Sequence, residues 1–136
     1  MKVAIYGQYF KIEDTQYVED LFQILANYNI AYVIESNYYK HLKKHLNLDK
    51  CNTFSSHKKL DNTFDFMFTI GGDGTILRAV TFIRASNIPI VGINTGRLGF
   101  LATIQKENIL SAIELLLKKE YVLKERSLLS VSAYYN

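Results

Sequence analysis

One aspartate lies among three glycines in the segment Gly71-Gly72-Asp73-Gly74-Thr75. The apolar residues before it favour a buried strand, and the residues Ile76, Leu77, Val80 and Ile83 after it recur at helical spacing. The glycines therefore occupy a strand-to-helix turn. Glycine lets the backbone approach a ligand closely, and the helix that follows offers unpaired N–H groups and the positive end of its dipole. The segment predicts a phosphate-binding turn formed by Gly71, Gly72, Gly74 and Thr75.

The carboxylate of Asp73 repels phosphate, so it needs a function of its own in such a turn. It can orient or deprotonate an attacking hydroxyl, as the aspartate of kinase catalytic loops does, or hold magnesium directly or through water. The alternative is an ordinary Gly-Asp-Gly turn whose aspartate bonds its own backbone. Three glycines beside a long apolar strand are more than that turn requires, so the sequence favours Asp73 as a catalytic residue.

Two other phosphate-binding patterns are excluded because the chain lacks the residues that they require. A P-loop requires G-x-x-x-x-G-K-[ST], and no glycine in this chain precedes a Lys-Ser or Lys-Thr pair. The dinucleotide fingerprint requires G-x-G-x-x-G after the first strand, but the first strand here is followed by Gly7-Gln8-Tyr9-Phe10. Any nucleotide must be bound in another way.

A second glycine-rich segment, Gly92-Ile93-Asn94-Thr95-Gly96-Arg97-Leu98-Gly99-Phe100-Leu101, begins at the end of another apolar strand. Doubly wound sheets bind ligands outside the carboxyl ends of their strands. The turns after the two strands are therefore expected to face one crevice. Asn94 and Thr95 would offer polar contacts to a nucleotide there, and Phe100 either stacks on a base or packs in the core.

The two segments together, about twenty residues apart, resemble the amino-terminal domain of NAD kinases. Diacylglycerol and sphingosine kinases and phosphofructokinases carry turns similar to the first segment. The second segment, with its ending Leu98-Gly99-Phe100, distinguishes NAD kinases from these. The start of the chain, Ile5-Tyr6-Gly7-Gln8-Tyr9, also resembles NAD kinases of the Bacteroidetes. The resemblance covers essentially the whole chain and implies a three-layer, Rossmann-like α/β domain with a mostly parallel sheet.

The resemblance implies ATP-dependent, or in some members polyphosphate-dependent, phosphorylation of the 2′-hydroxyl on the adenosine ribose of NAD, giving NADP with a divalent cation such as Mg²⁺. Asp73 corresponds to the family's proton acceptor or hydroxyl-orienting group, and the NAD contacts correspond to Asp73, Gly74, Arg78 and Phe100. A ribose hydroxyl is a poor nucleophile, so a nearby carboxylate could aim its oxygen and accept its proton. Arg78, one turn into the helix, points either toward a phosphate or toward solvent.

The chain has 136 residues, enough for one domain. NAD kinases have a second, mostly β domain that supplies an Asn-Glu pair, and no Asn-Glu dipeptide follows the second glycine-rich segment here. We therefore expect an amino-terminal fragment, with an α/β domain at 1–123 and the linker and first strand of a truncated second domain at 124–136. Such a fragment would have little or no kinase activity alone, and the full-length enzyme would be a homo-oligomer.

The rest of the sequence predicts the elements that position these segments. Strands are expected at 3–6, 31–35, 64–70 and 88–93 and again from 121 onward. Helices are expected at 15–27, from a cap at Ser36 to about His45, after the first glycine turn, and near 107–120 with Ile109, Leu110, Ile113 and Leu116 or Leu117 facing inward. A polar connection is expected at 47–62. The alternation of strands and helices predicts right-handed crossovers between parallel strands.

Composition sets broader bounds. Apolar residues make up 49% of the chain, which predicts a folded core, and no apolar run approaches the length of a membrane span. The single cysteine, Cys51, and the absence of a signal-peptide pattern favour a reduced, cytoplasmic setting. The net charge is only +3, so the basic middle of the chain indicates a solvated face more than a nucleic-acid surface. His41 and His45 have helical metal spacing, but they lack a third ligand nearby, so no protein-held metal is predicted.

Three functions remain open from the sequence. The first is an NAD kinase, supported by both glycine-rich segments. The second is a lipid or sugar kinase that shares the Asp73 turn without needing the second segment. The third is a non-catalytic nucleotide-binding module.

Overall fold

The computed structural model describes residues 1–48, 50–102 and 104–135. A sheet of six strands forms its centre, in the order β3-β2-β1-β4-β5-β6. All five pairs of neighbouring strands are parallel, which confirms the predicted parallel α/β sheet. The strands are β1 (Lys2–Gly7), β2 (Ala31–Glu35), β3 (Thr53–Phe54), β4 (Phe66–Gly71), β5 (Ile90–Asn94) and β6 (Ile104–Gln105).

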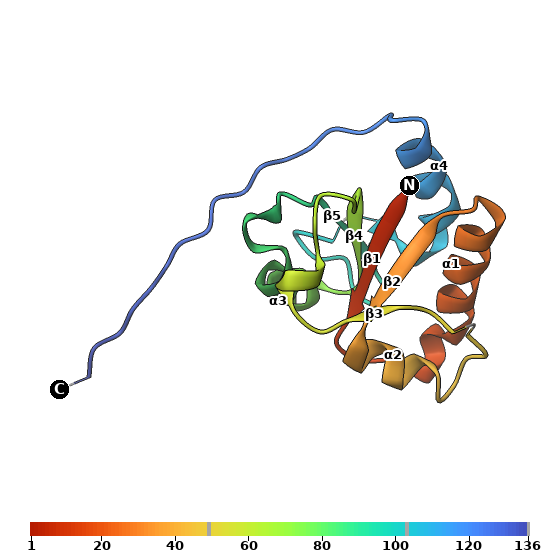
Figure 1. Ribbon diagram of the computed structural model, residues 1–136, viewed down its shortest axis with the longest axis horizontal. Coiled ribbons are helices and arrows are strands. Elements are labelled where there is room, and N and C mark those ends of the chain that lie inside the picture. Colours follow the sequence, from red (N-terminus) through yellow and green to blue (C-terminus); the bar gives the residue numbers. More distant parts are fainter. Residues whose placement is uncertain (49, 103, 136) are drawn as a thin grey trace.

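Helices cover both faces of this sheet, as Figure 1 shows. Core residues of α1, α2 and α4 pack together on one face, whereas α3 packs on the other. The predicted three-layer arrangement is therefore confirmed. The helices are α1 (Thr15–Asn27), α2 (Ser36–Leu42), α3 (Asp73–Ile83) and α4 (Ile109–Leu117), with short 3-10 turns at Ile12–Asp14, His57–Lys59, Arg84–Ser86 and Lys106–Asn108.

The central strand β1 shows why both faces need cover. Val3 and Ile5 are fully buried beneath α1 and its neighbours, whereas Ala4 and Tyr6 belong to the core beneath α3. Successive side chains of a strand point to opposite faces, so a strand with apolar residues at every position is stable only between two layers of helices. The continuous apolar runs of β1 and β4 thus dictate the three-layer fold.

Helix α2 is capped differently from the prediction. Ser36 is its first residue, and the cap is Glu35, whose carboxylate accepts the N–H of Tyr38 at 2.8 Å. Ser36 Oγ instead donates to a backbone carbonyl of β3 at 3.0 Å. Glu35 can act as the cap because it is the last, extended residue of β2 and its carboxylate reaches the third N–H of the helix. The helix ends at Leu42, before the predicted end near His45.

The two edge strands were not predicted. Strands β3 and β6 have two residues each, too few to show the alternation that identifies a strand. The segment at 47–62, expected to be a polar connection only, therefore carries β3 and a 3-10 turn. One predicted inward residue is also wrong, because Leu110 of α4 is 48% exposed.

The strand predicted from Tyr121 onward is not present. Residues 121–135 form neither helix nor strand, and Figure 1 shows them leading away from the domain. The Tyr121 ring packs against the Phe66 ring with centroids 5.4 Å apart, but most of the residues that follow are exposed. A strand requires a neighbouring strand to pair its backbone, and the described part of the chain places none beside this segment.

Candidate functional site

The strand order reverses between β1 and β4, since the chain runs outward from β1 to β3 before it returns to β4 on the other side. Ligands of open parallel sheets bind at the carboxyl ends of the strands at such a reversal. The loops that meet at this edge follow β1, β4 and β5. Gly71 is in register with Asn94, and the N–H of Thr95 donates to the Gly71 carbonyl at 3.3 Å. The two glycine-rich segments therefore do lie side by side.

The first glycine-rich loop has one glycine that the backbone requires and two that it does not. Gly71 has a φ of +151°, a backbone conformation that residues with a Cβ rarely adopt, and a Cβ there would overlap Thr75 Oγ1. Gly72 has an ordinary φ of −117° and nothing within 4 Å of a Cβ built on it. Gly74 likewise faces open space, with only the Gln8 side chain 4.0 Å away.

Thr75 faces inward beneath this loop. It is 6% exposed, and its hydroxyl lies 3.5 Å from Gln8 Oε1 at the end of β1. The amides of Asp73 and Gly74 precede the first hydrogen bond of α3, so they have no carbonyl partner within the helix. These two N–H groups, rather than the Thr75 hydroxyl, are therefore directed at whatever approaches the turn.

Asp73, the first residue of α3, joins the two loops. Its Oδ2 accepts the N–H of Phe100 at 2.8 Å, and its Oδ1 accepts the N–H of Leu101 at 2.9 Å and that of Ala102 at 3.1 Å. These three bonds hold the pKa of the Asp73 carboxyl below its usual range, with the Phe100 amide the largest cause. Asp73 is thus a fixed carboxylate between the loops.

The second loop is organised by Asn94. This residue is 1% exposed, its amide nitrogen donates to the Arg97 carbonyl at 2.6 Å, and its Oδ1 accepts the Gly96 N–H at 2.8 Å. Both polar ends of the side chain are used within the loop, so Asn94 shapes the loop in this conformation. The Arg97 side chain is exposed.

The remaining predicted contacts, Phe100 and Arg78, lie on the outside of this edge. The Phe100 side chain is 93% exposed, so it does not pack in the core. Arg78 is exposed on α3, and its positive charge acts on Tyr6 near the end of β1. Burial is the main cause that raises the pKa of Tyr6, the Glu35 carboxylate adds to it, and Arg78 opposes both. Arg78 therefore lies close enough to Tyr6 for its charge to affect the pKa of the phenol.

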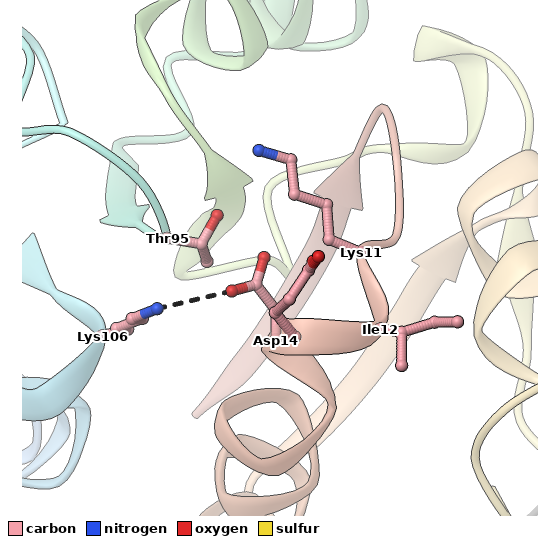
Figure 2. Close-up of a pocket in the computed structure, with 6 residues that line it drawn as sticks. Lys11, Ile12, Asp14, Thr95 and Lys106 are labelled. Atoms are coloured by element: carbon pink, nitrogen blue, oxygen red, sulfur yellow. Dashed lines mark ion pairs between the residues drawn. The ribbon is translucent and has the colours of Figure 1, made fainter.

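A hollow of about 650 Å³ opens next to Thr95, between the β1–α1 connection and the residue after β6. Figure 2 shows Lys11 and Thr95 at its rim and the pair of Asp14 and Lys106 beneath. Lys106 Nζ lies 3.5 Å from Asp14 Oδ1. Glu13 also lines the hollow, so its two lysines are matched by two carboxylates. The side chains that line the hollow therefore give it no net formal charge.

The residues that the sequence reasoning missed are Gln8 and the amide donors at 100–102. Gln8 follows a buried strand at the same edge as Gly71, so strand order alone would have pointed to it. Nothing in the sequence indicated that the backbone at 100–102 would bind Asp73. Across residues 1–48, 50–102 and 104–135 no group of three His, Cys, Asp or Glu side chains is placed to hold a metal ion. No helix among these residues is long and apolar enough to cross a membrane.

Comparisons with known proteins agree with one another. Residues 3–121 match the family model described as the ATP-NAD kinase N-terminal domain. The chain is 48% identical over 132 residues to the NAD kinase of Christiangramia forsetii, covering 96% of this chain and 45% of that relative. It is 44% identical over 133 residues to the NAD kinase of Flavobacterium johnsoniae, covering 97% of this chain and again 45% of the relative. The chain thus spans less than half the length of these curated relatives.

Two solved structures are similar in fold. A crystal structure of yeast NADH kinase complexed with NADH superposes with a TM-score of 0.71 at 17% identity, covering 86% of this chain and 38% of that chain. A crystal structure of an NAD kinase from Archaeoglobus fulgidus in complex with ATP gives a TM-score of 0.56 at 25% identity, covering 88% of this chain and 38% of that chain.

Proposed function

This chain belongs to the ATP-NAD kinase family, through that family's N-terminal domain, and from that premise we propose that it takes part in the phosphorylation of NAD to NADP. The phosphoryl group would come from ATP and be transferred to the 2′-hydroxyl of the adenosine ribose. The observation that carries the proposal is the position of Asp73, a fixed carboxylate at the N-terminus of α3 and at the reversal of strand order.

Asp73 would orient the attacking hydroxyl. Two carboxylate oxygens offer about four acceptor positions, and three amides occupy Oδ1 twice and Oδ2 once. The free position on Oδ2 could accept a bond from a ribose hydroxyl and so aim its oxygen at the phosphorus. Because the same three bonds lower the pKa of Asp73, the carboxylate is a weak base before transfer. Its arrangement therefore supports orientation over early deprotonation.

The first glycine-rich loop would hold phosphate. Gly72 and Gly74 leave open space beside the two free amides of the first turn of α3. The sequence also suggested phosphate binding by Gly71, Thr75 and Asn94, but these residues would act indirectly. Gly71 packs against Thr75, and the Asn94 side chain is bonded within its own loop.

NAD would be contacted by Asp73, Gly74, Arg78 and Phe100. The exposed Phe100 ring offers an apolar surface on which a base can stack. Arg78 is available to a negatively charged phosphate, because its side chain is exposed on α3.

The divalent cation that the family resemblance implies does not fit a site made by this chain. The described residues include no group of three metal-ligating side chains, and Asp73 is already bonded to three amides. Magnesium commonly binds one or two carboxylates together with substrate phosphates, so the cation would enter with ATP. The roles proposed for the residues of this chain do not depend on it. A cytoplasmic location, homo-oligomer assembly and the division at residue 123 stay predictions.

The test is NADP formation from NAD, ATP and magnesium by a chimera. It joins this chain to the part of the Christiangramia forsetii NAD kinase that lies beyond the matched 132 residues. We expect the chimera to form NADP, the 136-residue chain alone to form little or none, and Asp73→Asn to lower kcat of the chimera by about 100-fold or more. The relative's carboxyl-terminal part alone is the control. A folded chimera without activity, or full activity with Asp73→Asn, would contradict the proposal.

A further inference from the structure

Gly99 lies directly against the carboxylate of Asp73. A Cβ built on Gly99 would lie 2.6 Å from Asp73 Cγ and 2.7 Å from Oδ2, and it would overlap Oδ1. Real Cβ atoms do not approach other atoms this closely. The backbone of Gly99 does not itself require glycine, since among the described glycines only Gly71 has a positive φ. The reason for glycine at this position is therefore the space that Asp73 occupies.

The Asp73 side chain has no easy way to yield to a side chain at residue 99. Its two oxygens accept three amides, from Phe100, Leu101 and Ala102, which follow Gly99 directly in the chain. Moving the carboxylate aside breaks these bonds, and moving the loop aside carries the donors away with it. A side chain at residue 99 is therefore incompatible with the three hydrogen bonds that the amides at 100–102 donate to Asp73.

We propose that Gly99 is a positioning residue for the phosphoryl-transfer site. Because it has no side chain, the Asp73 carboxylate can accept hydrogen bonds from the three amides at 100–102, and these bonds hold the two glycine-rich loops together. The inference rests on the proposed function for its catalytic meaning. In this proposal Gly99 acts through Asp73, the side chain that it lies against. By holding Asp73, it also sets the direction in which the backbone presents the exposed Phe100 ring.

Gly96 provides the matched control within the same loop. Nothing lies within 4 Å of a Cβ built on Gly96, and its N–H bond to Asn94 Oδ1 survives substitution by alanine. Gly96→Ala and Gly99→Ala add the same methyl group to the same loop, three positions apart. They differ in whether that methyl group meets Asp73.

The first experiment follows the amide protons of Phe100, Leu101 and Ala102 by NMR in the 136-residue chain. In the unmodified chain and in Gly96→Ala, we expect all three amide shifts to titrate together with Asp73. In Gly99→Ala, we expect the common titration to disappear and hydrogen exchange at these amides to accelerate by about 10-fold or more. An unchanged titration in Gly99→Ala would overturn the proposal.

A double-mutant cycle separates positioning from general packing. If Gly99 acts through Asp73, Gly99→Ala should lower the urea midpoint in the unmodified chain but change it little in the Asp73→Ala background. Equal losses in both backgrounds would overturn the proposal, because the methyl group would then clash with something other than Asp73.

The catalytic arm uses the chimera described above. Gly99→Ala should lower kcat/KM by about 10-fold or more, Gly96→Ala should leave it unchanged, and Gly99→Ala should cost nothing further when Asp73 is already Ala, because the atoms that the methyl group meets are then absent. An additive loss in the Asp73→Ala background would contradict positioning through Asp73. If the unmodified chimera forms no NADP, the proposed function fails. The NMR and urea results still decide whether Gly99 is needed for the three amide bonds to Asp73.

Discussion

The two glycine-rich loops look alike in sequence but use their glycines for opposite purposes. In the first loop, Gly72 and Gly74 face open space. In the second glycine-rich segment, two glycines face the first turn of α3, because Gly92 in β5 lies against Ile76 and Gly99 in the loop after β5 lies against Asp73. The first loop therefore leaves room for a ligand from outside, whereas the second segment leaves room for side chains of the first turn of α3. In the function proposed above, the first loop would form the binding surface and the second segment would support it.

The largest effect should come from Gly71, the glycine of the first loop that the fold requires. Gly71→Ala places a Cβ on a residue with φ +151° and against Thr75 Oγ1, so both backbone strain and overlap oppose folding. We expect the free energy of unfolding to fall by about 3 kcal/mol, measured by urea denaturation of the chain. A loss smaller than about 1 kcal/mol would mean that the end of β4 relaxes at little cost.

Gly92 should be the next most sensitive position. A Cβ there would lie 2.6 Å from Ile76 Cδ1 and 3.0 Å from Ala102 Cα. The Ile76 methyl group can turn away, but the backbone of Ala102 cannot, so Gly92→Ala should cost about 2 kcal/mol of unfolding free energy. Gly96→Ala, in the open loop that follows β5, serves as the control and should cost less than about 0.5 kcal/mol. Equal losses at the two positions would remove the distinction between support and open loop.

Gly72 should show the reverse pattern. Gly72→Ala meets no atom within 4 Å, and its φ of −117° suits any residue, so stability should change by less than about 0.5 kcal/mol. The added methyl group would occupy the space proposed for phosphate. We therefore expect KM for ATP or NAD in the chimera to rise by about 10-fold, equivalent to about 1.4 kcal/mol. A variant with unchanged kinetics would show that no ligand approaches the backbone at this point.

The sequence was sufficient for the framework and for the first loop. Continuous apolar runs identified β1, β4 and β5, and the helix at Thr15–Asn27 was predicted with the bounds that α1 has. These elements follow from local periodicity, which is present in the sequence itself. The two-residue strands β3 and β6 could not be found this way, because two residues are too few to show a periodicity and their backbone is ordered by pairing with β2 and β5.

The link between the loops lay beyond sequence reasoning for a different physical reason. Three backbone amides bind Asp73, and a backbone amide is present at every residue except proline, so its use leaves no trace in residue types. Asn94 illustrates the same limit, since the sequence marked its side chain as polar but did not show that it bonds the loop's own backbone. Residue type identified which side chains are polar, and only the fold showed where their bonds go.

The smallest effect concerns pH and tests the same link from the side of Asp73. Its folded pKa is lowered, first by the Phe100 amide and then by those of Leu101 and Ala102, whereas in the unfolded chain it should be near 3.9. A carboxyl with a depressed folded pKa stabilises the fold above its unfolded pKa, and this contribution is lost as pH falls through the folded pKa. The stability difference between the unmodified chain and Asp73→Asn should thus be constant near neutral pH and shrink below about pH 4. Urea midpoints of both proteins, measured from pH 7 to pH 3, check this difference directly, because every other titrating group is common to the two. A difference that stays constant over the whole range would mean that the charge of Asp73 contributes nothing to holding the second loop on the first.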